Sequence, residues 1–153
     1  KQVSIDKAAP GQHAPRVERR IGFVKAKYRT IVSTTPYSMT AKLMVQGVIA
    51  ANRYRNMQKS ASSTSDLSPR EKSLGRQLDY VRDVGQPFGT YCQATVPNTD
   101  NADAPRTEAC IALHPRESQT GSMVLMRIRD SRVITRANVI ALPMPDALIA
   151  QLN

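Results

Sequence analysis

The run MVLMRIRDSRVI, residues 123–134, decides the fold of the second half of the chain. It places β-favouring apolar residues on both sides of Asp130 and Ser131, two residue types that are common in tight turns. Two such segments joined by a short polar turn form an antiparallel hairpin. We therefore expect a hairpin here, with Arg127 and Arg129 on one face of its first strand, because successive side chains of a strand point to opposite faces.

Further strands are expected on both sides of this hairpin. From Asp83 onward, short β-favouring segments are separated by turn residues, a spacing typical of small antiparallel sheets and barrels. Pro143 and Pro145 end the last segment, and Asp146 is expected to cap a final turn of helix that runs to Asn153. The four expected strands are residues 91–96, 109–113, 123–129 and 133–142.

Before Asp83 the apolar residues follow a helical period instead. Pro15 suits the first turn of a helix, and Pro36 disfavours helical angles at the residue before it, so a helix is expected between them. A second helix is expected over residues 38–57, and it is apolar around so much of its circumference that it needs burial on more than one side. One face of the first helix carries Val17, Ile21, Val24, Tyr28 and Ile31 at steps of three and four residues.

The sequence therefore predicts an α+β fold, a helical hairpin followed by a small antiparallel β-sheet or barrel. The expected segments are a helical one (residues 1–58), a linker with a short helix that opens at Ser68 and ends near Gly75 (59–86), and a small β-rich module (87–153). No run approaches the eighteen or so apolar residues that span a bilayer, so no membrane partner is expected. Because the sequence begins at Lys1 rather than at Met, we expect a processed or excised piece.

The charge of the chain indicates the class of its partner. Lys and Arg number 22 against 12 Asp and Glu, a formal net charge of +10. Such a balance favours binding to nucleic acid, an anionic membrane surface or an acidic protein. An exposed helix face or hairpin is also rich in Arg and Lys for solubility alone, and that alternative stays open. The candidate binding residues are Arg16, Arg19, Arg20, Lys25, Lys27 and Arg29, on the face of the first helix opposite its apolar residues, and Arg127, Arg129, Arg132 and Arg136 on the hairpin.

Motifs for catalysis or metal binding are missing from the sequence. It has no glycine-rich phosphate loop, no nucleophile elbow and no Cys/His pairing. Cys92 and Cys110 do not make a disulfide framework, and neither His13 nor His114 stands at a metal-ligand spacing from a cysteine. We therefore expect no zinc site, and we expect both histidines to lie in loops. We also do not expect a complete enzyme.

Several short motifs, in this order, resemble the copia-type retrotransposon polyproteins. The run HAPRVERRI, residues 13–21, followed by Lys25, Arg29 and TPY (35–37), is similar to the end of their integrase core. Later motifs resemble the segment between that core and the reverse transcriptase. They are LSPR (67–70), GR (75–76), LDY (78–80), PFG (87–89) with Tyr91, RT (106–107), AL (112–113), Gly121, Arg136 and LPMPD (142–146).

This resemblance implies a role in DNA integration without an intact active site. Integrases of this kind hold two divalent metal ions with two Asp and one Glu on a ribonuclease-H-like fold, and two-metal chemistry needs all three carboxylates. Glu18 matches the catalytic Glu, whereas both Asp positions lie upstream of this chain in the family, and Asp6 is too close to replace either. The resemblance therefore implies no resident cofactor, with Mg²⁺ only if the missing carboxylates are supplied elsewhere.

In this interpretation the first two helices are the last helices of the integrase core, without their sheet. The β-rich half is then the small carboxy-terminal module that contacts DNA and neighbouring subunits in integrases. The leading hypothesis is a nucleic-acid-binding, non-catalytic fragment that also binds a protein partner or itself. The alternative is a structural component of a large assembly such as a ribonucleoprotein, and a third hypothesis is an integrase subunit that borrows its Asp residues in trans.

Overall fold

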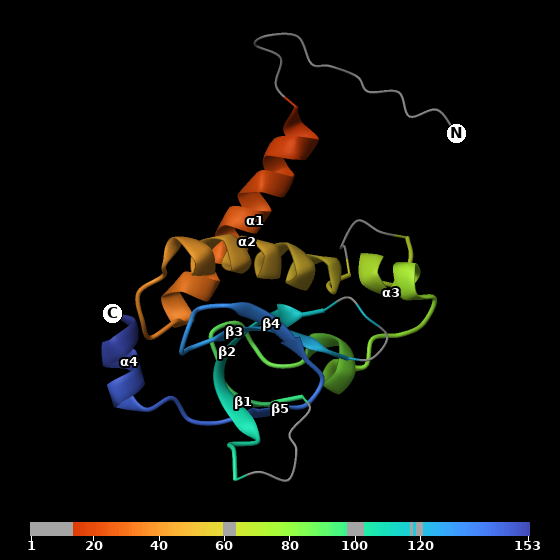
Figure 1. Cartoon of the computed structure of the whole chain (residues 1–153). Coiled ribbons are helices and arrows are strands. Elements are labelled where there is room, and N and C mark those ends of the chain that lie inside the picture. Colours follow the sequence, from red (N-terminus) through yellow and green to blue (C-terminus); the bar gives the residue numbers. More distant parts are fainter. Residues whose placement is uncertain (1–13, 60–63, 98–102, 117, 119–120) are drawn as a thin grey trace.

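The computed structural model describes residues 14–59, 64–97, 103–116, 118 and 121–153. Helices occupy the first half and a five-stranded antiparallel sheet the second, which confirms the expected α+β class (Figure 1). None of the described helices combines the length and the hydropathy that a bilayer crossing needs. The elements are α1 (Pro15–Thr34), α2 (Ala41–Asn56), α3 (Pro69–Leu74), the π-helical turn η1 (Tyr80–Val84), β1 (Tyr91–Thr95), β2 (Thr107–Pro115), β3 (Met123–Arg127), β4 (Val133–Arg136), β5 (Val139–Ala141) and α4 (Asp146–Leu152).

Capping residues set the starts of the helices. Thr40 is the N-cap of α2, and its hydroxyl accepts a hydrogen bond from the Leu43 amide at 3.4 Å. The expected start of this helix at Ser38 is therefore three residues too early. α3 begins after a capping box at Ser68, as expected. Asp146 is the first residue of α4 and no side chain caps that helix, so the expected cap is wrong.

The sheet has the order β4-β3-β2-β1-β5, which places the last two strands of the chain at opposite edges. The expected single strand over 133–142 is therefore wrong, because β4 pairs with β3 and β5 pairs with β1. Such a short link between two edges requires a strongly curled sheet. The Thr95 amide of β1 donates to the Asn138 carbonyl in that link at 3.2 Å, and a bulge in β2 between Ala112 and His114 adds to the bend.

α2 lies on the sheet and covers the main hydrophobic core (Figure 1). Leu43, Ala50 and Ala51 on its inner face are buried together with residues of β2. The expectation that this helix lacks a sheet is therefore wrong for its inner face, because the sheet of the same chain covers it. The helical segment and the β-rich module share this core, whose buried members are Ile31, Tyr37, Leu43, Ala50, Ala51, Phe88, Ile111, Leu113 and Met126.

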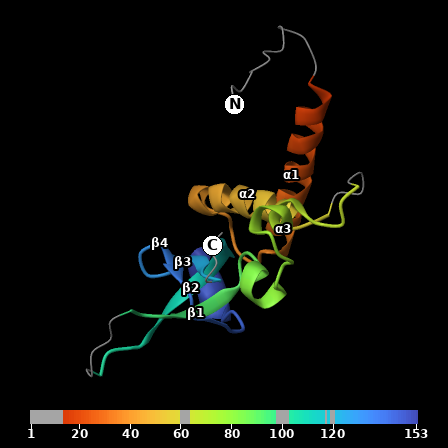
Figure 2. The same cartoon turned by 90° about the vertical axis from the view of Figure 1, so that its right-hand side faces the viewer.

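α1 crosses α2 and then projects beyond the rest of the fold (Figure 2). The two helices approach closely at Gly47, where a Cβ atom would lie 3.0 Å from Cε2 of Tyr28. Ile31 near the end of α1 is buried, whereas Val17 and Ile21 are 57% and 49% exposed. The described residues therefore cover only the C-terminal half of the apolar face that the sequence predicts for this helix.

Two cysteines lie in a second, smaller core of the sheet. Cys92 in β1 is the register partner of Cys110 in β2, and both thiols are free and buried. Burial raises the pKa of Cys92 to about 12 and that of Cys110 to about 11. His114 is also buried, in β2, so its expected loop position is wrong, and His13 lies outside the described residues.

Candidate nucleic-acid interface

Six of the ten predicted basic residues lie on α1, but they do not share one face. Each residue advances about 100° around an α-helix. Arg16, Arg20 and Lys27 therefore lie on one side of α1, whereas Lys25 and Arg29 lie on roughly the opposite side. The expected single basic face is wrong because the apolar stripe that packs towards α2 runs between these two rows.

The end of α2 adds an arginine to the first row. The guanidinium carbon of Arg55 lies 4.7 Å from the centre of the Phe23 ring, and Nη2 of Arg20 donates to Oδ1 of Asn56 at 2.9 Å. Both contacts order an arginine side chain while its charge stays at the surface. We use the name helical arginine cluster for the four arginines that, with Phe23, line a recess of about 180 Å³: Arg16, Arg19, Arg20 and Arg55.

The helical arginine cluster keeps most of its positive charge. Among the described residues, no carboxylate forms an ion pair with Arg16, Arg19 or Arg55. α1 and α2 together contain a single acidic residue, the exposed Glu18. Guanidinium groups that converge with so few carboxylates are suited to bind phosphate oxygens, which they engage through two parallel hydrogen bonds.

Arg53 has a different role although it lies only two residues before Arg55. Its Nη1 lies 2.9 Å from Nδ1 of His114 and donates to the Pro115 carbonyl, while Nε2 of His114 lies 3.0 Å from Oε1 of Gln46. Because a guanidinium only donates, Nδ1 accepts, and Nε2 carries the hydrogen and donates it in a hydrogen bond to Oε1 of Gln46. Arg53 therefore anchors the last turn of α2 to β2.

The arginines of the hairpin are mostly paired within the fold. Glu108 in β2 lies between two of them, with Oε2 at 3.1 Å from Nη1 of Arg127 and Oε1 at 2.8 Å from Nη2 of Arg136. The Arg127 side chain is only 13% exposed, and it also donates from Nε to Oδ1 of Asp130 at 2.9 Å. We call this set, Glu108, Arg127, Asp130 and Arg136, the closed arginine network.

The charges of the closed arginine network compensate one another. Hydrogen bonds from Arg127 lower the pKa of Asp130 to about 2, and bonds to Asp130 and Glu108 raise the pKa of Arg127. Arg132, 77% exposed, lies 3.5 Å from Asp130, and Arg129 is exposed in the turn. Of the four predicted hairpin residues, only these last two present their charge to solvent.

Glu18 lies exposed on α1. Within residues 14–59, 64–97, 103–116, 118 and 121–153, no three His, Cys, Asp or Glu side chains are placed to hold a metal ion. The described residues therefore do not bring beside Glu18 the two further carboxylates that two-metal chemistry needs, and Asp6 lies outside them.

Sequence reasoning missed Arg55 and Phe23 as parts of the candidate site. The signal for Arg55 is its place in the last turn of a helix that ends in RYRN, residues 53–56, where basic residues complement the helix dipole. Nothing in the sequence separates Arg55 from Arg53, because only the tertiary structure places one at the surface and the other beside His114. Comparisons with known protein families, with curated proteins and with solved structures found no match to this chain.

Proposed function

We propose that this protein binds nucleic acid, without catalysis of its own, through the helical arginine cluster. The observation that carries the proposal is the convergence of four arginines from two helices around Phe23, none of them with a carboxylate partner among the described residues. The contacts of Arg20 with Asn56 and of Arg55 with Phe23 also reduce the side-chain entropy that binding would remove.

The binding that we propose is electrostatic and depends only slightly on sequence. Four guanidinium groups that each neutralise one phosphate of duplex DNA give a slope of about −3.6 for log affinity against log salt. Phosphate contacts fix position and carry no sequence information directly. Lys27 lies on the same side of α1 and would extend the contact along the backbone.

The resemblance to copia-type integrases supports DNA as the nucleic acid and DNA integration as the process. In that proposal the chain contributes DNA contacts and Glu18, and any strand transfer requires two further carboxylates that residues 1–153 do not supply. The alternative proposal is a structural component of a large assembly such as a ribonucleoprotein. Its support is the exposed apolar surface of α1 and α2, which includes Val17, Ile21 and Val45.

The test compares two triple variants that lose the same charge. One carries Arg16→Gln, Arg19→Gln and Arg55→Gln, and the other carries Arg106→Gln, Arg129→Gln and Arg132→Gln. Binding to a short labelled DNA duplex is measured by fluorescence anisotropy over a series of NaCl concentrations. The helical variant should bind at least about tenfold more weakly and lose roughly 2.7 units of salt slope, whereas the control should stay within about threefold.

Equal losses in both variants would mean that only net charge matters and would reject the helical arginine cluster as the interface. A larger loss in the control would move the interface to the hairpin. Affinity that does not depend on salt would favour the assembly alternative. Circular dichroism of each variant checks that the substitutions leave the fold intact.

A further inference from the structure

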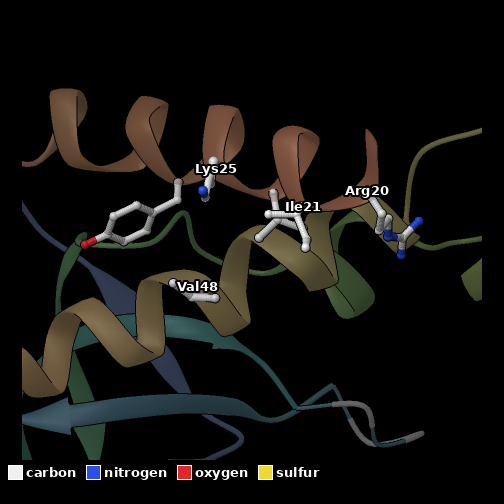
Figure 3. Close-up of a pocket in the computed structure, with 6 residues that line it drawn as sticks. Arg20, Ile21, Lys25 and Val48 are labelled. Carbon is white, nitrogen blue, oxygen red and sulfur yellow. The ribbon is translucent and has the colours of Figure 1, made fainter. Parts of the chain in front are cut away.

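An apolar groove lies beside the helical arginine cluster, between α1 and α2. It has a volume of about 360 Å³ and is lined by Ile21, Val24, Tyr28 and Val48, with Arg20 and Lys25 as its polar members. Figure 3 shows Ile21 on α1 and Val48 on α2 facing each other across the gap, with Arg20 and Lys25 on either side of Ile21 along α1.

Exposed apolar side chains extend the groove on both helices. Val17 on α1 is 57% exposed, and Met44, Val45 and Val48 on α2 are 46%, 60% and 45% exposed. Contiguous exposed apolar surface of this kind often marks an interaction site. The α1 positions that face it, 17, 21, 24 and 28, span about 16 Å, or three helical turns. This length and spacing match the apolar face of one short helix laid in a groove.

The charge around the groove restricts what can occupy it. α1 and α2 carry nine Lys and Arg residues and one acid. A second copy of this chain would present the same basic residues, so pairing of this face with itself would bring like charges together. A phosphate backbone would pair with Arg20 and Lys25 but would leave Ile21 and Val48 uncovered.

We propose that the groove binds an acidic amphipathic α-helix of a partner protein. Its apolar residues would cover Ile21, Val24 and Val48, and its carboxylates would lie against Lys25 and Arg29 on one side and Arg20 on the other. This site lies next to the helical arginine cluster and shares only Arg20 with it. The chain therefore joins a nucleic acid and an acidic protein segment through adjacent surfaces of one helix pair.

The probe is a labelled synthetic helix with Leu at positions i, i+4, i+7 and i+11 and Glu on the flanking positions. One control peptide has the same composition in shuffled order, and a second replaces each Glu by Lys. The protein variant carries Ile21→Ser and Val48→Ser, two exposed positions that leave the core intact, and Val81→Ser is a matched exposed control. Binding is followed by fluorescence anisotropy, and far-ultraviolet circular dichroism checks the fold.

The acidic amphipathic peptide should bind, and the double Ser variant should bind it at least about tenfold more weakly because two apolar contacts are lost. The Val81→Ser protein should bind like the parent, and the Lys peptide should not bind. Equal binding of the shuffled peptide, or an unchanged affinity of the double Ser variant, would overturn the proposal. So would a concentration-dependent dimer in sedimentation that Val48→Ser abolishes, since the occupant would then be a second copy. DNA binding is measured on the same variants, so loss of the peptide site and loss of the nucleic-acid site are separately visible.

Discussion

The two groups of arginines in this protein differ in what surrounds them rather than in their number. In the closed arginine network, Glu108 lies between Arg127 and Arg136, and Asp130 pairs with Arg127 from the turn. In the helical arginine cluster, an aromatic ring and an amide hold Arg55 and Arg20 instead. An ion pair stabilises a charge and also neutralises it, whereas a ring or an amide orders the side chain without removing its charge.

A basic cluster is therefore a candidate interface only when few carboxylates lie beside it in the fold. The side chains of Arg127 and Glu108 are 13% and 10% exposed, and charges so far from solvent need partners within the fold. Arg16 and Arg19 lie exposed at the surface of a projecting helix, where water solvates their charges. In the function that we propose, the closed arginine network contributes to stability and the helical arginine cluster to binding.

The largest expected effect is on stability, from Glu108→Gln. This change leaves Arg127 and Arg136 without their shared carboxylate. The free energy of unfolding should fall by about 3 kcal/mol, the low end for a buried pair that loses one member, because these side chains are only partly buried. Urea unfolding followed by circular dichroism measures it. DNA affinity of the folded variant should remain that of the parent. Arg19→Gln is the matched opposite, with less than about 0.5 kcal/mol of stability lost and weaker DNA binding.

If Glu108→Gln instead weakened DNA binding while Arg19→Gln did not, the assignment of the two regions would be reversed. If Glu108→Gln left the unfolding free energy unchanged, the closed arginine network would not stabilise the sheet.

A second prediction concerns the helix crossing that assembles the helical arginine cluster. A Cβ on Gly47 would lie 3.0 Å from Tyr28, so Gly47→Leu should separate α1 from α2 and lower the unfolding free energy by about 1–3 kcal/mol. It should also weaken DNA binding, because Arg16 and Arg19 would move away from Arg55. Gly22→Ala is the control: nothing lies within 4 Å of a Cβ there, and alanine should stabilise α1 by up to about 1 kcal/mol. Unchanged DNA binding in Gly47→Leu would show that Arg55 does not act together with the arginines of α1.

Local sequence signals predicted most element types and the antiparallel pairing of the hairpin strands β3 and β4, but not the strand order of the whole sheet. The Pro15 start of α1, the Ser68 cap and the turn at Asp130 and Ser131 were all readable, because each depends on neighbouring residues. The split of the last strand was not readable, since the residues from 133 to 142 are largely apolar and only the curl of the sheet sends β5 to the opposite edge.

The candidate site was predictable to a similar extent. Composition and helical spacing identified Arg16, Arg19 and Arg20 as candidates, but they also named Arg127 and Arg136. Glu108, which neutralises both, lies 19 and 28 residues away from them in the sequence. Such a partner is found only when the register of β2 and β3 and the position of β4 are known.

The two regions should also respond differently to acid. Hydrogen bonds from Arg127 lower the pKa of Asp130 from its ordinary value near 4 to about 2 in the folded state. The stability from this carboxylate is therefore present above pH 4 and lost as the pH falls through 2. In thermal unfolding, the melting temperature of Asp130→Asn should lie below that of the parent at pH 7 and approach it at the lowest pH. The control Asp103→Asn, which removes an exposed acid, should melt like the parent at every pH. A constant difference between Asp130→Asn and the parent from pH 7 to pH 2 would show that Asp130 acts through packing and not through its charge.

The smallest expected effect comes from a change that alters the ordering of the Arg55 side chain but removes no charge from the helical arginine cluster. Phe23→Leu keeps an apolar side chain of similar size and every arginine, but removes the ring on which Arg55 lies. A surface cation–π contact is worth about 0.5–1 kcal/mol, so DNA affinity should fall by roughly two- to fivefold at low salt. The salt slope should stay that of the parent, because the number of phosphates neutralised does not change. Arg55→Gln gives the contrasting result, with a lower affinity and a slope reduced by about one unit. A reduced slope in Phe23→Leu would mean that the ring is needed for Arg55 to reach a phosphate at all, and an unchanged affinity would mean that Arg55 is equally well placed without it.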